Sequence, residues 1–118
     1  MKMPLKKITP EELFQKMNTQ DKVVLLDVRA EDKYNDFHIE GPSIESQNIH
    51  KEEIFKYEEN KNDVVGSLPK NQEIVVTCTT GNSATKCANI LSNQKYNVAV
   101  LEGGITAWKE FLKAKEEY

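Results

Sequence analysis

Residues 73–84 read Glu73-Ile-Val-Val-Thr-Cys-Thr-Thr-Gly-Asn-Ser-Ala84. Within this stretch, the β-branched run 74–76 predicts a strand covered on both faces. Polar residues that suit a loop follow it. Four residues then recur at the helical spacing i, i+3, i+4, i+7: Ala84, Cys87, Ala88 and Leu91. The pattern places Cys78 at the carboxyl end of a strand, in a loop that leads into a helix.

This position gives Cys78 a possible chemical role. The first amides of a helix have no partner within the helix, and the helix dipole adds partial positive charge there. A loop that curls around Gly81 can direct several N–H groups inward and form an anion-binding nest. Such a nest favours the thiolate, so Cys78 is a candidate nucleophile for covalent chemistry. Position alone leaves an inert, buried thiol as the alternative.

Length and charge limit the classes of protein to consider. The chain has 118 residues and a net charge of −3, with Lys and Glu interleaved. This length predicts one domain, residues 1–118, with a single core. No basic cluster occurs beyond residues 1–7, so nucleic acid is not an expected partner.

No apolar segment is long enough to span a membrane, and no signal-peptide pattern occurs. The expected location is therefore the cytoplasm, with no membrane partner. In that reducing compartment, the two cysteines are expected to be a reactive thiol and a core residue rather than a disulfide. The two Cys and two His include no compact ligand pair, so no metal site is predicted.

Strands and helices are predicted to alternate along the chain. Further strands are predicted at residues 7–8, 23–26 and 97–101, and helices at 9–17, 31–37, 51–59, 84–91 and 105–112. The helix near residue 9 begins with a capping box, in which Thr9 is the N-cap, Pro10 takes the first position and Glu12 closes the box. Ile44 and Ile49 are isolated apolar anchors in a polar stretch, for which no element is predicted.

Each predicted strand is a continuous apolar run, so the expected fold is α/β, a parallel sheet with helices on both faces. In such sheets, ligands bind beyond the carboxyl ends of the strands. Loops 27–29, 78–83 and 102–104 are therefore predicted to meet at one edge.

Four motifs now point to a family: Leu25-Leu26-Asp27-Val28-Arg29, His38-Ile39-Glu40-Gly41, Cys78-Thr79-Thr80-Gly81-Asn82-Ser83, and Leu101-Glu102-Gly103-Gly104-Ile105-Thr106-Ala107-Trp108. In order and spacing, the chain resembles a single-domain rhodanese, a sulfurtransferase, from about Ile8 to Leu112. The resemblance implies a rhodanese-like parallel sheet and a loop cysteine, Cys78, that carries sulfur as a persulfide.

The activity implied by the resemblance needs no metal or organic cofactor. The Cys78 thiolate takes the terminal sulfur from a small-molecule donor and passes it to a thiol or cyanide, with a sulfur-relay protein as a further possible partner. Five loop residues are expected to stabilise the anionic persulfide through their amides: Thr79, Thr80, Gly81, Asn82 and Ser83.

The loop departs from the common family pattern, Cys-x-x-Gly-x-Arg followed by Ser or Thr. Ser83 stands where the arginine is usual, Ala84 replaces the hydroxyl residue, and Thr79 is uncharged where many members are basic. Because a guanidinium binds a dianion as a planar charged fork, its absence predicts weak use of thiosulfate. Low-molecular-weight persulfides or polysulfides are the expected donors.

Other residues of the motifs are expected to support the site. Asp27 and Arg29 are expected to orient neighbouring loops through hydrogen bonds and an ion pair, and His38 to be a structural imidazole. Cys87 lies on the apolar helix face, which favours core packing over a resolving role in redox chemistry. His50 is expected at the surface.

Two other functions stay open from sequence. A cysteine phosphatase or arsenate reductase can share this fold, although an oxyanion substrate needs a roomier loop and usually an arginine clamp. A non-catalytic rhodanese-like module would keep the fold and recruit a partner with its surface.

Overall fold

The computed structural model describes residues 5–19, 22–41, 43–59 and 68–116. Its five strands form one sheet in the order β1-β5-β4-β2-β3, and every pair is parallel. The strands are β1 (Lys6–Ile8), β2 (Val23–Asp27), β3 (Ile44–Asn48), β4 (Ile74–Thr77) and β5 (Val98–Leu101). The predicted domain limits, residues 1 and 118, lie outside the described residues.

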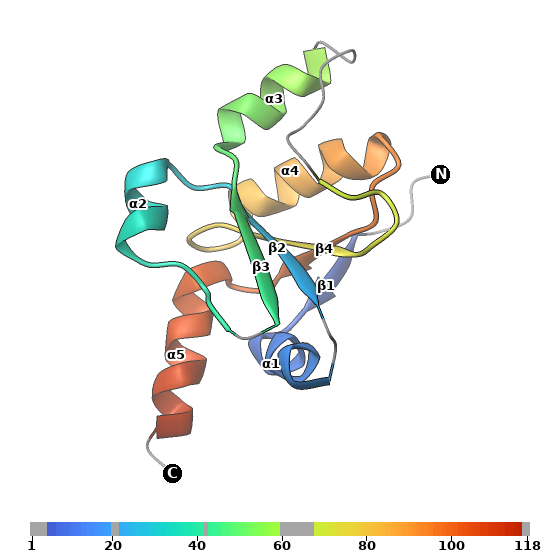
Figure 1. Cartoon of the computed structure of the whole chain (residues 1–118). Coiled ribbons are helices and arrows are strands. Elements are labelled where there is room, and N and C mark those ends of the chain that lie inside the picture. The colour runs from blue at the N-terminus through green and yellow to red at the C-terminus, as the bar shows by residue number, and fades with distance from the viewer. Residues whose placement is uncertain (1–4, 20–21, 42, 60–67, 117–118) are drawn as a thin grey trace.

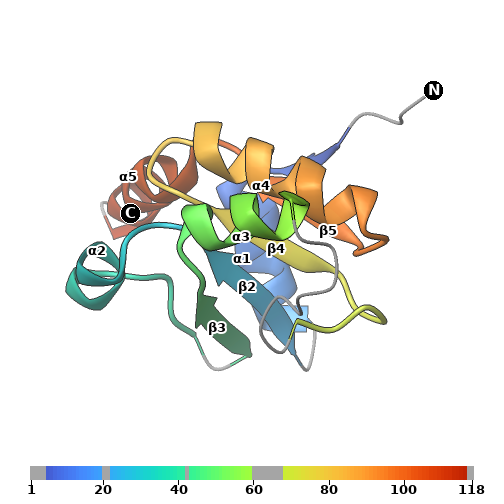
Figure 2. The same ribbon diagram turned by 90° about the horizontal axis from the view of Figure 1, so that it is seen from above.

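Helices cover both faces of the sheet, as Figures 1 and 2 show. The helices are α1 (Pro10–Thr19), α2 (Glu31–Asp36), α3 (Lys51–Glu59), α4 (Asn82–Asn93) and α5 (Gly104–Glu116). Side chains of α3 and α4 share one buried cluster with the sheet, and side chains of α1 and α5 share the other. The predicted α/β fold, a parallel sheet with helices on both faces, is confirmed.

Strand β4 lies at the centre of the sheet, between β2 and β5. Ile74 and Val76 pack into the cluster beneath α4, while Val75 packs into the cluster beneath α1 and α5. All three are at most 1% exposed. A central strand covered on both faces must be apolar throughout, which explains why this run was readable in the sequence.

Strand β3 was missed from the sequence. It pairs only with β2, at the edge of the sheet, and none of its residues is fully buried. Because an edge strand can be half exposed, residues 44–48 do not need a continuous apolar run, and Ile44 is their one aliphatic residue. The strand brings His50 and Lys51, which follow it, to the carboxyl edge of the sheet.

The predicted capping box of α1 is confirmed. The Thr9 N–H donates to Glu12 Oε1 at 3.0 Å, and the Glu12 N–H donates to Thr9 Oγ1 at 3.1 Å. Hydrogen bonding to Thr9 lowers the pKa of the Glu12 carboxyl, and the bond from the Thr9 backbone N–H has the larger effect. Within the described residues, no helix has both the length and the apolar composition needed to cross a membrane.

Candidate active site

Cys78 directly follows β4, and its sulfur accepts two backbone hydrogen bonds. The Gly81 N–H lies 3.0 Å from Sγ and the Ala84 N–H lies 3.3 Å from it. The residue is 5% exposed. Two amides directed at one sulfur stabilise negative charge on it, as helix N-termini do for anions.

The loop curls because Gly81 adopts φ +106°, in the region that favours glycine. Gly81 is the N-cap of α4, so the first amides of this helix point toward the loop. Four amide N–H groups of the loop, those of Thr79, Thr80, Asn82 and Ser83, donate no hydrogen bond to any described residue. They are available to an anion bound in front of the sulfur.

The start of α5 holds the other side of the loop. The Ile105 N–H donates to the Cys78 carbonyl at 2.8 Å, and the Thr106 N–H donates to the Thr79 carbonyl at 3.0 Å. These bonds turn both carbonyls toward α5. Gly104 lies against the Cys78 carbonyl, and Arg29 lines one cavity together with residues of loop 78–83. The predicted meeting of loops 27–29, 78–83 and 102–104 at one edge is therefore confirmed, and two helix N-termini frame the cysteine loop.

Gly104 permits this close approach, and we expect its replacement to disturb the loop. A Cβ at this position would lie 2.3 Å from the Cys78 carbonyl oxygen and 2.8 Å from the Thr79 carbonyl, at φ +59°. We expect Gly104→Ala to lower the free energy of unfolding in urea by about 2–4 kcal/mol, through backbone strain and overpacking together.

Gly81→Ala is the matched control, because a Cβ there has positive φ but meets nothing closer than 3.7 Å. It should cost about 1–2 kcal/mol, from strain alone. Equal losses in the two variants would show that the contact between Gly104 and the Cys78 loop does not matter for stability.

A cavity of about 330 Å³ opens in front of Cys78. Four predicted loop residues line it: Thr79, Thr80, Asn82 and Ser83. Gly81 is not in the lining and contributes its N–H to Sγ instead. The opposite wall comes from the segments after β2 and β3: Val28, Arg29, Ala30, Lys33, His50 and Lys51.

This wall makes the cavity cationic. Lys33, Lys51 and the partly exposed His50 contribute basic groups, and no Asp or Glu is among the described residues that line the cavity. Neither lysine was predicted from the sequence to belong to the site, and His50 was expected only at the surface. Lys33 was detectable, since it lies in the helix that follows a predicted strand. His50 and Lys51 were not, because β3 was not predicted.

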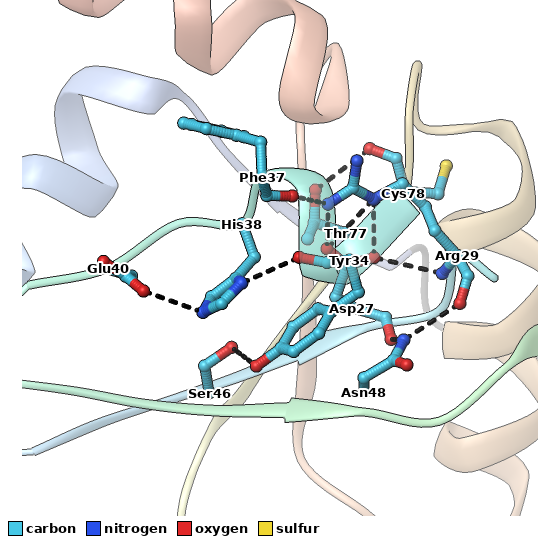
Figure 3. A network of polar contacts seen from close by, with 10 residues as sticks. All are labelled: Asp27, Arg29, Tyr34, Phe37, His38, Glu40, Ser46, Asn48, Thr77 and Cys78. Atoms are coloured by element: carbon cyan, nitrogen blue, oxygen red, sulfur yellow. Dashed lines mark hydrogen bonds and ion pairs between the residues drawn. The ribbon is translucent and has the colours of Figure 1, made fainter. Parts of the chain in front are cut away.

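Arg29, which lines this wall, forms a nearly buried ion pair with Asp27 (Figure 3), and the two side chains are 9% and 1% exposed. Arg29 Nε donates to both carboxylate oxygens at 2.9 and 3.0 Å, and Nη2 donates to Oδ2 at 2.7 Å. Nη2 also donates to the carbonyl of Phe37, the C-cap of α2. The pair therefore ties α2 to the end of β2, and Arg29 is largely occupied within the protein.

His38 does not line the Cys78 cavity. Its Nδ1 lies 2.9 Å from the Tyr34 carbonyl oxygen, and its Nε2 lies 3.1 Å from Glu40 Oε1. The ring stacks on Tyr34 with centroids 4.0 Å apart, and the Tyr34 hydroxyl contacts Ser46 Oγ at 2.7 Å (Figure 3). These contacts connect α2 to β3, which suits a structural imidazole.

Cys87 is fully buried on the inner face of α4, and both cysteines are free thiols. Burial first, and then the nearby Cys78, raise the pKa of the Cys87 thiol to about 12. A thiol with this pKa stays protonated near neutral pH and is a poor nucleophile. The core position expected from the sequence is confirmed.

Selective alkylation tests the difference between the two cysteines. We expect iodoacetamide at pH 8 to add one group to the folded protein, on Cys78, because Cys87 is buried and protonated at that pH. Intact mass with peptide mapping measures the product. The folded Cys78→Ser variant should stay unmodified and should gain one group in urea. Equal labelling of both residues in the folded wild type would contradict the assignment.

No group of three or more His, Cys, Asp or Glu side chains within the described ranges is placed to hold a metal ion.

Comparison with known proteins places these features in a family. Residues 9–111 match the family model described as Rhodanese-like domain. The probable adenylyltransferase/sulfurtransferase MoeZ of Mycobacterium tuberculosis is 31% identical over 107 residues, which cover 90% of this chain and 25% of that protein. This chain thus spans about a quarter of the length of that relative.

Solved structures show the same fold. A rhodanese-like domain protein from Staphylococcus aureus aligns with a TM-score of 0.73 and 24% identity, covering 88% of this chain and 91% of the other. A rhodanese-related protein from Thermoplasma volcanium aligns with a TM-score of 0.67 and 26% identity, covering 90% and 92%. An NAD-dependent persulfide reductase from A. fulgidus aligns with a TM-score of 0.61 and 27% identity, covering 88% of this chain and 16% of that protein.

Proposed function

Because this chain belongs to the rhodanese-like domain family, we propose that it is a sulfurtransferase that carries sulfane sulfur as a persulfide on Cys78. One observation carries the proposal: Sγ of Cys78 accepts N–H bonds from Gly81 and Ala84 while facing a cationic cavity. This environment suits a thiolate before transfer and an anionic persulfide after it.

The reaction proceeds in two displacement steps. In the first, the Cys78 thiolate attacks the outer sulfur of a donor R–S–SH, the donor S–S bond breaks, and RS⁻ leaves. In the second, an acceptor thiolate attacks the outer sulfur of the Cys78 persulfide and restores the Cys78 thiolate. Each step breaks one bond to the transferred sulfur as it forms another, so no external oxidant or reductant is required.

The loop amides supply electrostatic stabilisation during both steps. The two that reach Sγ hold charge on the inner sulfur. The unpaired N–H groups of Thr79, Thr80, Asn82 and Ser83 are the proposed donors to the outer sulfur. This arrangement works as an oxyanion hole does, with donors fixed before charge develops.

The proposed donor is a persulfide or polysulfide rather than thiosulfate. Ser83 presents a short hydroxyl where a guanidinium fork would bind the dianion at two points. Lys33 and Lys51 add positive charge to the cavity from other elements, but an ammonium acts as a point charge without that planar geometry. Anions are therefore attracted, while the specific two-point recognition of thiosulfate is lost.

The proposed acceptor is a thiol, either free or on a sulfur-relay protein, and the proposed location is the cytoplasm. The names of two similar proteins, a probable adenylyltransferase/sulfurtransferase and a persulfide reductase, describe sulfur chemistry in longer chains. Their other activities belong to those proteins. A free, amide-stabilised Cys78 is compatible with a reducing compartment.

Intact mass after incubation with glutathione persulfide, and separately with thiosulfate, tests the proposal. We expect the wild type to gain one sulfur that cyanide removes. We also expect kcat/KM for the persulfide to exceed that for thiosulfate by at least about tenfold, a difference of about 1.4 kcal/mol in transition-state binding.

Two outcomes would contradict parts of this proposal. If thiosulfate is the better donor, Lys33 and Lys51 replace the missing arginine and the preference argued here is wrong. If no donor adds sulfur to the wild type, the sulfurtransferase proposal is wrong, and a non-catalytic binding module becomes the favoured alternative.

A further inference from the structure

A second cavity adjoins the one in front of Cys78. Its volume is about 510 Å³, and it lies between α2 and the start of α5. The two cavities share three lining residues, Arg29, Lys33 and Thr79. A molecule in the second cavity therefore contacts the loop that carries the nucleophile, at Thr79, the residue that follows Cys78. Both volumes are within the range of about 300–1,000 Å³ that is typical of small-ligand sites.

Charged side chains of both signs surround the second cavity. Asp32 and Asp36 of α2 are acidic, while Lys33 of α2 and Lys109 of α5 are basic. No ion pair within 4 Å joins these four residues to each other or to any other described residue. The charge of Arg29, the other basic group, is neutralised by Asp27.

The rest of the wall is apolar or neutral. Phe37 and the buried Ile105 contribute hydrocarbon surface, and Thr106 contributes a hydroxyl. Lys109 Nζ lies 4.6 Å from the centroid of the Phe37 ring, which holds the ammonium at the rim of the cavity. Two acidic and two basic groups around this surface complement a compact ligand that itself carries an ammonium and carboxylates.

We propose that the second cavity binds the body of an amino-acid- or peptide-based thiol, whose sulfur extends past Thr79 to Cys78. This inference rests on the proposed sulfurtransferase function and names the class of organic donor or acceptor. The carboxylates pair with Lys33 and Lys109, and the ammonium pairs with Asp36 or Asp32. A thiol that carries several phosphates fits poorly, because the two aspartates repel it.

A peptide thiol as the ligand also explains why the site consists of two adjoining cavities. An inorganic polysulfide or thiosulfate needs only the cavity in front of Cys78, with its basic wall. A peptide thiol needs room for its backbone and a balanced charge, and the second cavity supplies both. Discrimination between organic and inorganic donors therefore depends on residues that line the second cavity alone.

The kinetic test compares glutathione persulfide with sodium tetrasulfide in the 118-residue chain. Lys109→Ala removes a carboxylate partner, and Thr106→Trp fills the cavity from an exposed position while keeping the backbone bond to Thr79. We expect each variant to lower the ratio of kcat/KM for glutathione persulfide to that for tetrasulfide by about threefold to tenfold. Lys113→Ala, an exposed lysine on the same helix outside the lining, should leave this ratio unchanged.

A binding test without chemistry separates this inference from the proposed function. S-methylglutathione, titrated into Cys78→Ser and followed by NMR, should shift the amides of Thr106 and Lys109, and Lys109→Ala in the same background should weaken binding about threefold to tenfold. No binding, or an unchanged ratio in both kinetic variants, overturns the inference. Binding by Cys78→Ser, together with no sulfur transfer in the wild type, refutes the sulfurtransferase function and leaves the thiol site in place.

Discussion

We expect the Cys78→Ser variant to form no persulfide and to lose at least about a thousandfold in sulfur transfer, because a hydroxyl at this position cannot hold sulfane sulfur. The Cys78 sulfur accepts hydrogen bonds from the Gly81 and Ala84 N–H groups, and it faces the cationic cavity. Serine is close to cysteine in size, so the loop should keep its conformation. Intact mass after donor treatment and steady-state transfer to cyanide measure the loss.

Cys87→Ala is the matched control for Cys78→Ser. It removes the other thiol of the chain, which is fully buried and has a pKa raised to about 12, mainly by its burial. Persulfide formation should therefore persist in Cys87→Ala, with a loss of stability of about 1 kcal/mol from the small cavity. Transfer that survives in Cys78→Ser but disappears in Cys87→Ala would reverse the assignment of the nucleophile.

We expect Asp27→Asn to lower the free energy of unfolding by about 3 kcal/mol, because it leaves the Arg29 guanidinium without its charged partner. The Asp27 carboxylate is 1% exposed and accepts the Arg29 backbone N–H at 3.0 Å in addition to the guanidinium bonds. Asparagine keeps the shape of the side chain and removes its charge. Urea unfolding followed by circular dichroism measures the change.

Asp36→Asn makes the same chemical change at an exposed position of α2 that has no ion pair among the described residues. It should change stability by no more than about 0.5 kcal/mol. A double-mutant cycle with Arg29→Met then isolates the coupling between Asp27 and Arg29. Similar losses in Asp27→Asn and Asp36→Asn would mean that the buried pair does not stabilise the fold.

Local signals in the sequence predicted most of the elements. Ile74–Val76 had to be apolar because β4 is covered on both faces, and Thr9 with Glu12 had to form a capping box to satisfy the first amides of α1. The placement of Cys78 between β4 and α4 followed from the same local rules. Its role in catalysis stays a prediction.

Features that depend on contacts between distant parts of the chain could not be predicted from the sequence. Strand β3 is recognisable by its register with β2, in which Ile44 lies opposite Val23 and Asn48 opposite Asp27, and its own residues are mostly polar. Because β3 was not predicted, His50 and Lys51 could not be placed at the site, where they complete the cationic wall in front of Cys78. The contact of Gly104 with the Cys78 carbonyl is equally non-local.

The sequence alone therefore specified the α/β alternation and the loop between β4 and α4, with a thiol at its first residue. These features arise from burial, capping and backbone propensity, which act among neighbours in the chain. The charge of the cavity and the second cavity beside it arose only in the folded structure. Lys33, Lys51 and Lys109 come from three different helices, and they line two adjoining cavities only because parallel strands bring their carboxyl ends to one edge.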